Sequence, residues 1–177
     1  MDIFAIRNRL NSVLIEKLRA EYGDTAVTKE PIISELTGHN FGDREVPADR
    51  LQAVKQANRI AGAARAMVNE QATEARRHGR SWAEIADALS ITADTDDDPA
   101  VQAYRRVVGP DWRDTVSWRC ACCEQRVIDH GPYDAHPSNA EFGHAEDCER
   151  HHREIEALAR GRDREELGRD DDTDWGY

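Results

Sequence analysis

The chain has 177 residues, of which 33% are charged, and it is long enough to bury one compact core or two small ones. Its formal charge of −11 argues against a protein that coats nucleic acid through its overall charge, although a local basic face remains compatible. The N-terminus lacks the pattern of a signal peptide. No apolar run approaches the length of about 20 residues that a helix needs to span a bilayer. The sequence therefore predicts a cytoplasmic protein with no membrane partner.

The first part of the chain is predicted to be mainly helical. Apolar residues recur at helical spacing over 2–22, and over 48–78 they form a narrow stripe that contains many small residues. The stretch 23–47 is rich in proline and glycine and is interpreted as a connector, with a short helical turn at 32–36. We expect 48–78 to be a core helix packed on the first one. Its small residues at 57–64 also permit a homodimer.

Two shorter helices are expected next. Ser81 and Glu84 have the spacing of a capping box, which predicts a helix start at this point. Asp98-Pro99 is typical of an N-cap and a first helical position, and this second helix is expected to run to about Val107. Gly109-Pro110 then breaks the helix and marks the predicted domain boundary.

The last third of the sequence predicts a small mixed module. Alternating residues at 116–119 indicate a strand, and 126–129 is its expected partner across a turn. A helical pattern follows from 147 to 160, and the acidic stretch 161–177 is typical of a solvated tail.

The predicted fold class is therefore mainly α with a small α+β zinc module. We expect a helical domain at 1–109, which contains a helix-turn-helix-like unit at about 76–108. A zinc-binding module is expected at 110–160, followed by an acidic flexible tail at 161–177.

All four cysteines of the chain lie in the predicted module, beside most of its histidines. In a reducing compartment, clustered cysteines are more often metal ligands than disulfides. A Cys-x2-Cys pair followed by a His-x3-Cys pair supplies the four nitrogen and sulfur ligands that structural zinc prefers. The predicted ligands of one structural zinc ion are Cys120, Cys123, His144 and Cys148.

Other residues near this set leave two alternatives open. Cys122 lies between the two paired cysteines, and spacing alone does not assign its role. His151 follows Cys148 by three residues on the same predicted helix, so it is the main rival of His144 as the fourth ligand. His130, His136 and His152 are further alternates, which we interpret as surface histidines.

We do not expect the chain to be an enzyme. Four protein ligands fill the shell of a zinc ion, whereas catalytic zinc keeps an open position. The sequence also shows no nucleophile–base set and no phosphate-binding loop.

The segment Arg76–Ile91 resembles the first half of the sigma-factor-like helix-turn-helix found in many small actinobacterial proteins. In that pattern a long helix leads to a glycine, and Ser-Trp-Ala-Glu-Ile-Ala, here at 81–86, opens the supporting helix. The resemblance implies that a recognition helix follows and enters the major groove of DNA. The candidate nucleic-acid contacts are Arg76, Arg77, Arg80, Gln102, Arg105 and Arg106.

The second half of this pattern differs from the family. Ser90 stands where a turn glycine is expected, and the acidic run 94–98 stands where the recognition helix should begin. Negative charge at this position opposes docking to DNA phosphates. The scaffold is therefore predicted to be helix-turn-helix-like, with DNA reading weakened or lost.

The C-terminal third carries a second resemblance. The pattern begins with Trp118-x-Cys-x2-Cys, continues through Asp129-x-Gly-Pro-Tyr and ends with Glu-x-Gly-His144-Ala-Glu-Asp-Cys148. It is similar to a zinc-ribbon-like module of actinobacterial and actinophage proteins, in which it follows a helix-turn-helix. The resemblance implies a DNA-binding or transcription-regulatory role.

Two functions from different classes follow from these observations. The first is a DNA-binding regulator whose zinc module completes or orients the helix-turn-helix. The second is an acidic protein-interaction module on a degenerate helix-turn-helix scaffold, acting as an adaptor, an anti-repressor or a DNA mimic. DNA and a protein are accordingly the candidate partners.

Overall fold

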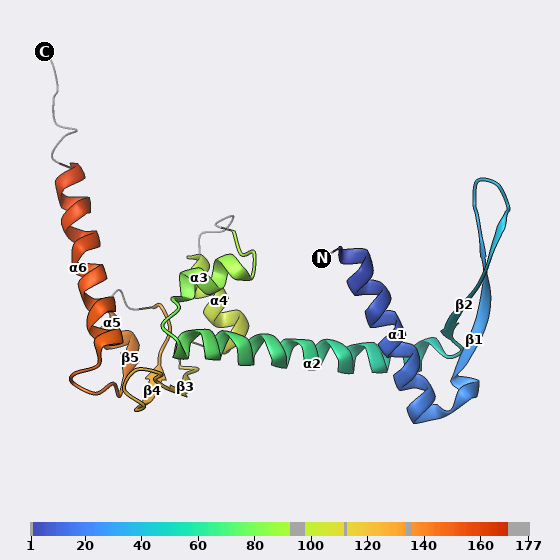
Figure 1. The fold of residues 1–177 in the computed structure, drawn as a ribbon, viewed down its shortest axis with the longest axis horizontal. Coiled ribbons are helices and arrows are strands. Elements are labelled where there is room, and N and C mark those ends of the chain that lie inside the picture. Colours follow the sequence, from blue (N-terminus) through green and yellow to red (C-terminus); the bar gives the residue numbers. More distant parts are fainter. Residues whose placement is uncertain (1, 93–97, 112, 134–135, 170–177) are drawn as a thin grey trace, which may run out of the picture. The chain divides into compact units, whose positions relative to one another are not determined.

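The computed structural model describes residues 2–92, 98–111, 113–133 and 136–169, with side chains up to residue 160. The chain forms two compact units, Met1–Ala66 and Met67–Tyr177, and the helix α2 (Arg50–Arg77) contributes to both (Figure 1). The division falls inside α2, so the predicted boundary at Gly109-Pro110 lies within the second unit. None of the described helices combines the length and apolarity needed to cross a membrane.

The first unit begins with α1 (Ile3–Tyr22), which confirms the predicted first helix. Asp2 caps its start, because the carboxylate accepts a hydrogen bond from the backbone N–H of Phe4 at 3.0 Å. Gly23 ends the helix in the left-handed region, with φ of 80°, where glycine is favoured. The predicted limits of this helix follow from these local cues.

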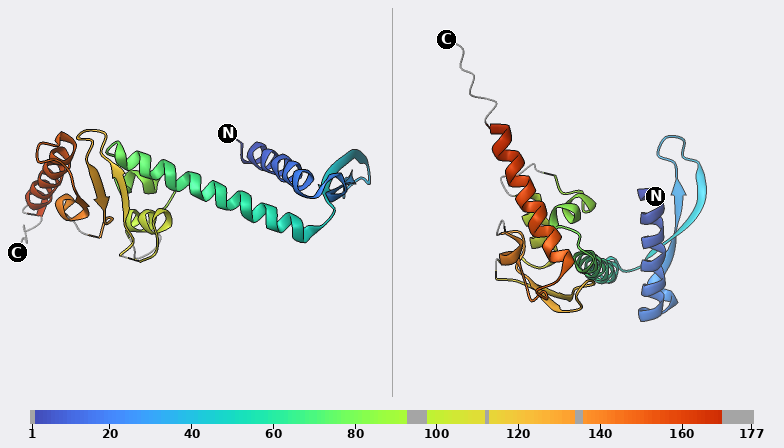
Figure 2. Two further views of the ribbon diagram at one scale, coloured as in Figure 1. Left: turned by 90° about the horizontal axis from the view of Figure 1, so that it is seen from below. Right: turned by 60° about the vertical axis from the view of Figure 1, so that its left-hand side comes forward.

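A β-hairpin replaces the connector that was predicted for residues 23–47. After a short 3₁₀ turn, η1 (Asp24–Ala26), β1 (Val27–Ile33) pairs antiparallel with β2 (Asn40–Pro47), with a bulge after Pro31 (Figure 2). Most residues of both strands are exposed, so no alternation of apolar and polar residues marked them in the sequence. The prediction was wrong because backbone pairing forms this hairpin with little burial.

The second unit contains the C-terminal part of α2, then α3 (Trp82–Ala88) and α4 (Pro99–Val107). The capping box of Ser81 and Glu84 is confirmed, and the Asp98 carboxylate accepts a hydrogen bond from the Ala100 N–H at 2.8 Å. These three helices share one apolar core. Its buried residues are Ala72, Trp82, Ile85, Ala86, Ala100, Ala103, Tyr104 and Val107.

The rest of this unit is the α+β part that the sequence predicted. β3 (Val116–Arg119), β4 (Arg126–Asp129) and β5 (Glu141–Phe142) form an antiparallel sheet in that order. The short helix α5 (Pro137–Ala140) precedes β5, and α6 (Glu149–Arg169) follows it (Figure 2). The fold is therefore mainly α with two small antiparallel sheets.

The acidic tail predicted at 161–177 overlaps α6. The backbone of α6 continues through Arg169, so residues 161–169 are helical. The remaining part of the predicted tail, 170–177, lies outside the described residues, as does most of the acidic run, at 93–97.

Candidate metal centre

Three separate segments bring the predicted metal ligands together. Cys120 and Cys123 lie on the turn between β3 and β4, which is closed by a hydrogen bond from the Glu124 N–H to the Cys120 carbonyl at 2.9 Å. His144 follows β5, and Cys148 immediately precedes α6. The sheet thus places the first pair of ligands next to the second pair, although they are distant in sequence.

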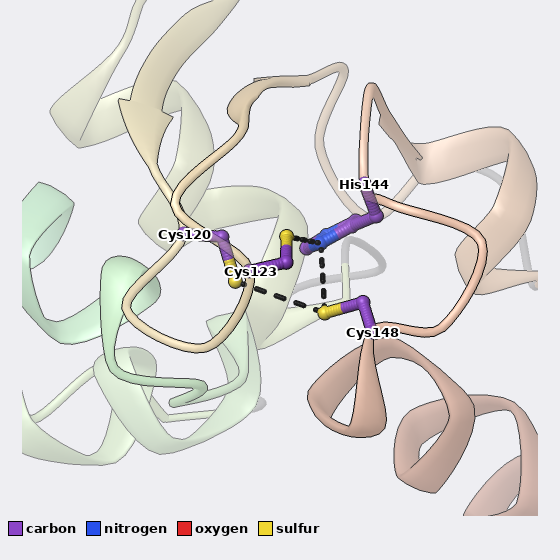
Figure 3. A group of neighbouring side chains, drawn as sticks. All are labelled: Cys120, Cys123, His144 and Cys148. Atoms are coloured by element: carbon purple, nitrogen blue, oxygen red, sulfur yellow. Dashed lines mark hydrogen bonds between the residues drawn. The ribbon is translucent and has the colours of Figure 1, made fainter.

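The ligand atoms of these four residues all lie within 4.8 Å of one another (Figure 3). The sulfurs of Cys120 and Cys148 are 3.9 Å apart, and His144 Nδ1 lies 3.4 Å from the Cys148 sulfur and 3.8 Å from the Cys123 sulfur. A zinc ion with tetrahedral bonds to sulfur and nitrogen requires S···S and S···N separations of about 3.8 and about 3.6 Å. The cluster therefore has the dimensions of a tetrahedral metal site.

Two thiols of the cluster have pKa values shifted in opposite directions. Burial alone would raise the pKa of Cys123, but backbone hydrogen bonds from Ala145 and Gln125 and a contact with His144 lower it to about 6. Burial and the neighbouring thiols of Cys123 and Cys120 raise the pKa of Cys148 to about 12. Adjacent thiolates repel one another, so a divalent cation bound among them would remove the penalty for ionising them all.

Glu141 orients the histidine of this cluster. The Nδ1 atom of His144 faces the sulfurs, while Nε2 lies 2.8 Å from the Glu141 carboxylate. With a metal on Nδ1, the proton remains on Nε2 and is donated to this carboxylate, which is a common arrangement around ligating histidines. Burial opposes ionisation of Glu141, but hydrogen bonds from His144 and Arg150 and the charge of Arg76 lower its pKa to about 2.

A buried ionic network extends from Glu141 to the helices. Arg150 donates to Glu141 at 2.8 and 3.1 Å, and Arg76 of α2 bonds both Glu141 and Asp129, with 3.0 Å between its Nε and the Asp129 carboxylate. The Trp82 indole N–H of α3 donates to the same Asp129 oxygen at 2.9 Å. The cluster of possible metal ligands is therefore connected through hydrogen bonds to α2 and α3.

Tyr104 adds α4 to this network. Its hydroxyl donates to the backbone carbonyls of Asp114 at 2.5 Å and of Asp129 at 3.2 Å, and its ring packs edge-on against Trp82. Gly131 lies directly against the Tyr104 ring, where an added Cβ would come within 2.8 Å of ring atoms. Contacts with Asp129, at the end of β4, and with Gly131 therefore hold α4 in place.

The structure corrects one predicted nucleic-acid contact. Arg76 is only 6% exposed, and its guanidinium is used by Asp129, Glu141 and the Arg80 carbonyl, so it cannot reach a phosphate. The other predicted contacts are at least partly accessible. Arg77 and Arg80 are exposed, with Glu74 and Glu84 as their ion-pair partners.

The predicted contacts on α4 lie on its outer side. Arg105 and Arg106 are exposed and Gln102 is half-buried, whereas Ala103 and Tyr104 face the core. Arg105 also stacks over the Tyr133 ring, with 5.9 Å between its guanidinium carbon and the ring centre.

The alternative histidines have other surroundings. His151 stacks on His144, with ring centres 4.5 Å apart, and belongs with Glu141 to a second group of possible ligands. His130 packs on Phe142, His136 caps α5, and His152 bonds the Glu146 carbonyl. Within the described residues, His144 is the histidine that joins the three cysteines, and Cys122 is exposed outside the cluster.

Three residues of this site were not singled out from the sequence as functional. Asp129 and Glu141 occurred only within the resemblance pattern, and Arg150 was not identified. Glu141 precedes His144 by three residues, a spacing that is compatible with a supporting carboxylate. The sequence offers no comparable cue for Arg150.

Comparison of the sequence with known protein families and curated proteins, and of the structure with solved structures, finds no match.

Proposed function

We propose that Cys120, Cys123, His144 and Cys148 bind one structural zinc ion. Three sulfurs and one imidazole are a common ligand set for structural zinc, and the interatomic distances of the cluster fit its bond lengths. Four protein ligands leave no open position for a substrate. The ion would stabilise a part of the chain whose apolar core is small.

Metal analysis tests this proposal. The purified chain should contain about one zinc ion per molecule, and cobalt should replace it with the spectrum of a tetrahedral thiolate site. Cys148→Ala should lose the metal or bind it much more weakly. Cys122→Ala is the matched control and should retain it. Full metal content and unchanged folding of the Cys148 variant would contradict the structural role.

We further propose that the chain is a DNA-binding regulatory protein. The observation that carries the proposal is the anchoring of α4, which buries Tyr104 and Ala103 while it leaves Arg105 and Arg106 exposed. A helix that is fixed from one side and basic on the other can present guanidinium groups to DNA. The two resemblances described from the sequence support the same function.

Gel shift of a random-sequence duplex at about 50 and about 200 mM salt tests DNA binding. We expect binding that falls steeply with salt and that is weakened by Arg106→Glu. Arg7→Glu makes the same change in net charge on α1 of the other unit, so it serves as the control. If the wild-type chain does not shift DNA even at the lower salt concentration, this function is wrong.

A protein-interaction module is the second candidate. It is favoured by the net charge of −11 and by an apolar groove of about 520 Å³ between α2 and α3. Met67 lies on this groove and is 63% exposed, so its side chain is accessible to a partner. A trough between two helices fits the apolar face of a third helix from a partner protein.

A variant pair distinguishes this candidate from the first. If the chain is an interaction module, a partner captured from a GC-rich bacterial lysate should be lost with Met67→Glu and retained with Arg106→Glu. Capture that is insensitive to Met67→Glu would count against this groove as the binding surface.

A further inference from the structure

A second surface of the same unit is basic and concave. A groove of about 570 Å³ lies between the end of α2, the cysteine turn and the first turns of α6. Four arginines line it, two from the α2–α3 junction and two from α6. The arginines and acids of its lining are Arg77, Arg80, Arg150, Arg153, Glu84 and Glu154.

The arginines of this groove outnumber the acids, and each acid is paired with one arginine of the lining. The Glu84 carboxylate accepts hydrogen bonds from Ser81 in the capping box and from Arg80 at 2.9 Å. Glu154 lies 3.1 Å from Arg150, and burial together with Glu141 raises its pKa. Arg77 and Arg153 therefore remain as the arginines of the groove that no acid of its lining balances, on a chain whose overall charge is −11.

Arg153 and Arg77 are the side chains best placed to bind a ligand here. Arg153 is exposed and makes no ion pair or hydrogen bond with the described side chains. Arg77 is also exposed, and its ion pair with Glu74 is long, at 3.5 Å. Guanidinium groups around a hollow match the planar, bidentate geometry of phosphate oxygens.

Two of the three walls of the groove begin at metal ligands. Ala121 and Cys122 belong to the turn between Cys120 and Cys123, and α6 starts directly after Cys148. The turn is joined to α2 by a hydrogen bond from the Ala121 N–H to the Arg77 carbonyl at 3.3 Å. A metal ion in the cluster would therefore fix the spacing between Arg77 and Arg153.

We infer that this groove binds the phosphodiester backbone of DNA, as a contact surface separate from α4. The inference rests on the proposed DNA-binding function and names a second site for it. Backbone contacts of this kind set the orientation of a protein on the duplex without reading its sequence. The cysteine turn and α6 would then contribute to DNA binding directly, in addition to stabilising the fold.

The test is fluorescence anisotropy of the full chain with a labelled random-sequence duplex over a range of salt concentrations. Arg77→Glu and Arg153→Glu should each weaken binding about tenfold at low salt. Each should also make the negative slope of log affinity against log salt shallower by about 0.9 for every phosphate that the variant no longer neutralises. Arg7→Glu is the control for net charge. Zinc content and circular dichroism show whether each variant is folded, and Arg77→Gln or Arg153→Gln replaces the corresponding glutamate variant if it is not.

The outcomes separate this inference from the proposed function. If the wild-type chain does not bind the duplex, both are overturned. If Arg106→Glu weakens binding while Arg77→Glu and Arg153→Glu behave like Arg7→Glu, the groove is overturned and DNA binding through α4 stands. If the groove variants weaken binding and make its salt dependence shallower, the groove is supported.

Discussion

At the scale of single residues, two charged side chains support the cluster of Cys120, Cys123, His144 and Cys148 without belonging to it. Glu141 contacts His144 on the side away from the sulfurs, and Arg76 contacts Glu141 from α2. Both are buried. Loss of Arg76 removes the arginine paired with buried Asp129, which is costly in a low-dielectric environment, whereas loss of Glu141 leaves Arg76 paired with Asp129 and Arg150 paired with Glu154. These two residues therefore give distinct tests of the site.

Glu141→Gln should weaken zinc binding by about 10- to 100-fold, because the amide supports the His144 imidazole less well than the carboxylate does. Competition with a chromophoric chelator measures this affinity. Glu149→Gln changes an exposed acid at the start of α6 and should leave the affinity unchanged. Equal affinities for the two variants would contradict the role given to Glu141.

Arg76→Ala should destabilise the second unit by about 3 kcal/mol, because it leaves Asp129 and Glu141 buried without their shared cation. Urea unfolding followed by tryptophan fluorescence measures this difference in the free energy of unfolding, since Trp82 and Trp118 are buried in the second unit. Arg65→Ala, at an exposed position of the same helix, should change it little. A small effect of Arg76→Ala would show that the network contributes little to stability.

At the scale of elements, the short helix α3 is held at its start by two interactions. Its start is fixed by the capping box, and Trp82 is fixed by its hydrogen bond to Asp129. A helix of 7 residues is too short to be stable by itself, so capping and packing must supply its stability. The position of α3 therefore depends on the sheet that carries Asp129.

Ser81→Ala should cost about 1 kcal/mol of stability through loss of the N-cap hydrogen bond to the Glu84 N–H. The measurement is again the free energy of unfolding, compared with Ser12→Ala on the exposed face of α1. An unchanged stability would indicate that the Trp82 contacts alone hold the helix start.

At the scale of the whole molecule, the two compact units should respond differently to loss of the metal. The second apolar cluster consists of Trp118, Cys120, Val127 and Cys148, and two of these are proposed ligands. Without a metal, this small core holds adjacent thiols and few apolar contacts. The first unit has its own core around Ile15 and Leu18 and contains none of the ligands.

Removal of the metal with a chelator should therefore abolish hydrogen-exchange protection over residues 116–160 and leave α1 and the β1–β2 hairpin protected. Re-addition of zinc should restore the protection of 116–160. Protection that persists at 116–160 without metal would show that the sheet and the ionic network suffice for folding.

The sequence determined the parts of this protein that depend on local pattern. Helical periodicity and capping residues placed α1, α2 and α3 close to their observed limits, and the spacing of Cys120, Cys123, His144 and Cys148 identified the cluster. Only the tertiary structure decided what depends on distant partners. Arg76 lies beside Arg77 in a basic segment, yet it is buried because its carboxylate partners are 53 and 65 residues further along the chain. Likewise, the β1–β2 hairpin forms through backbone hydrogen bonds, which side-chain patterns do not encode when both strands are exposed.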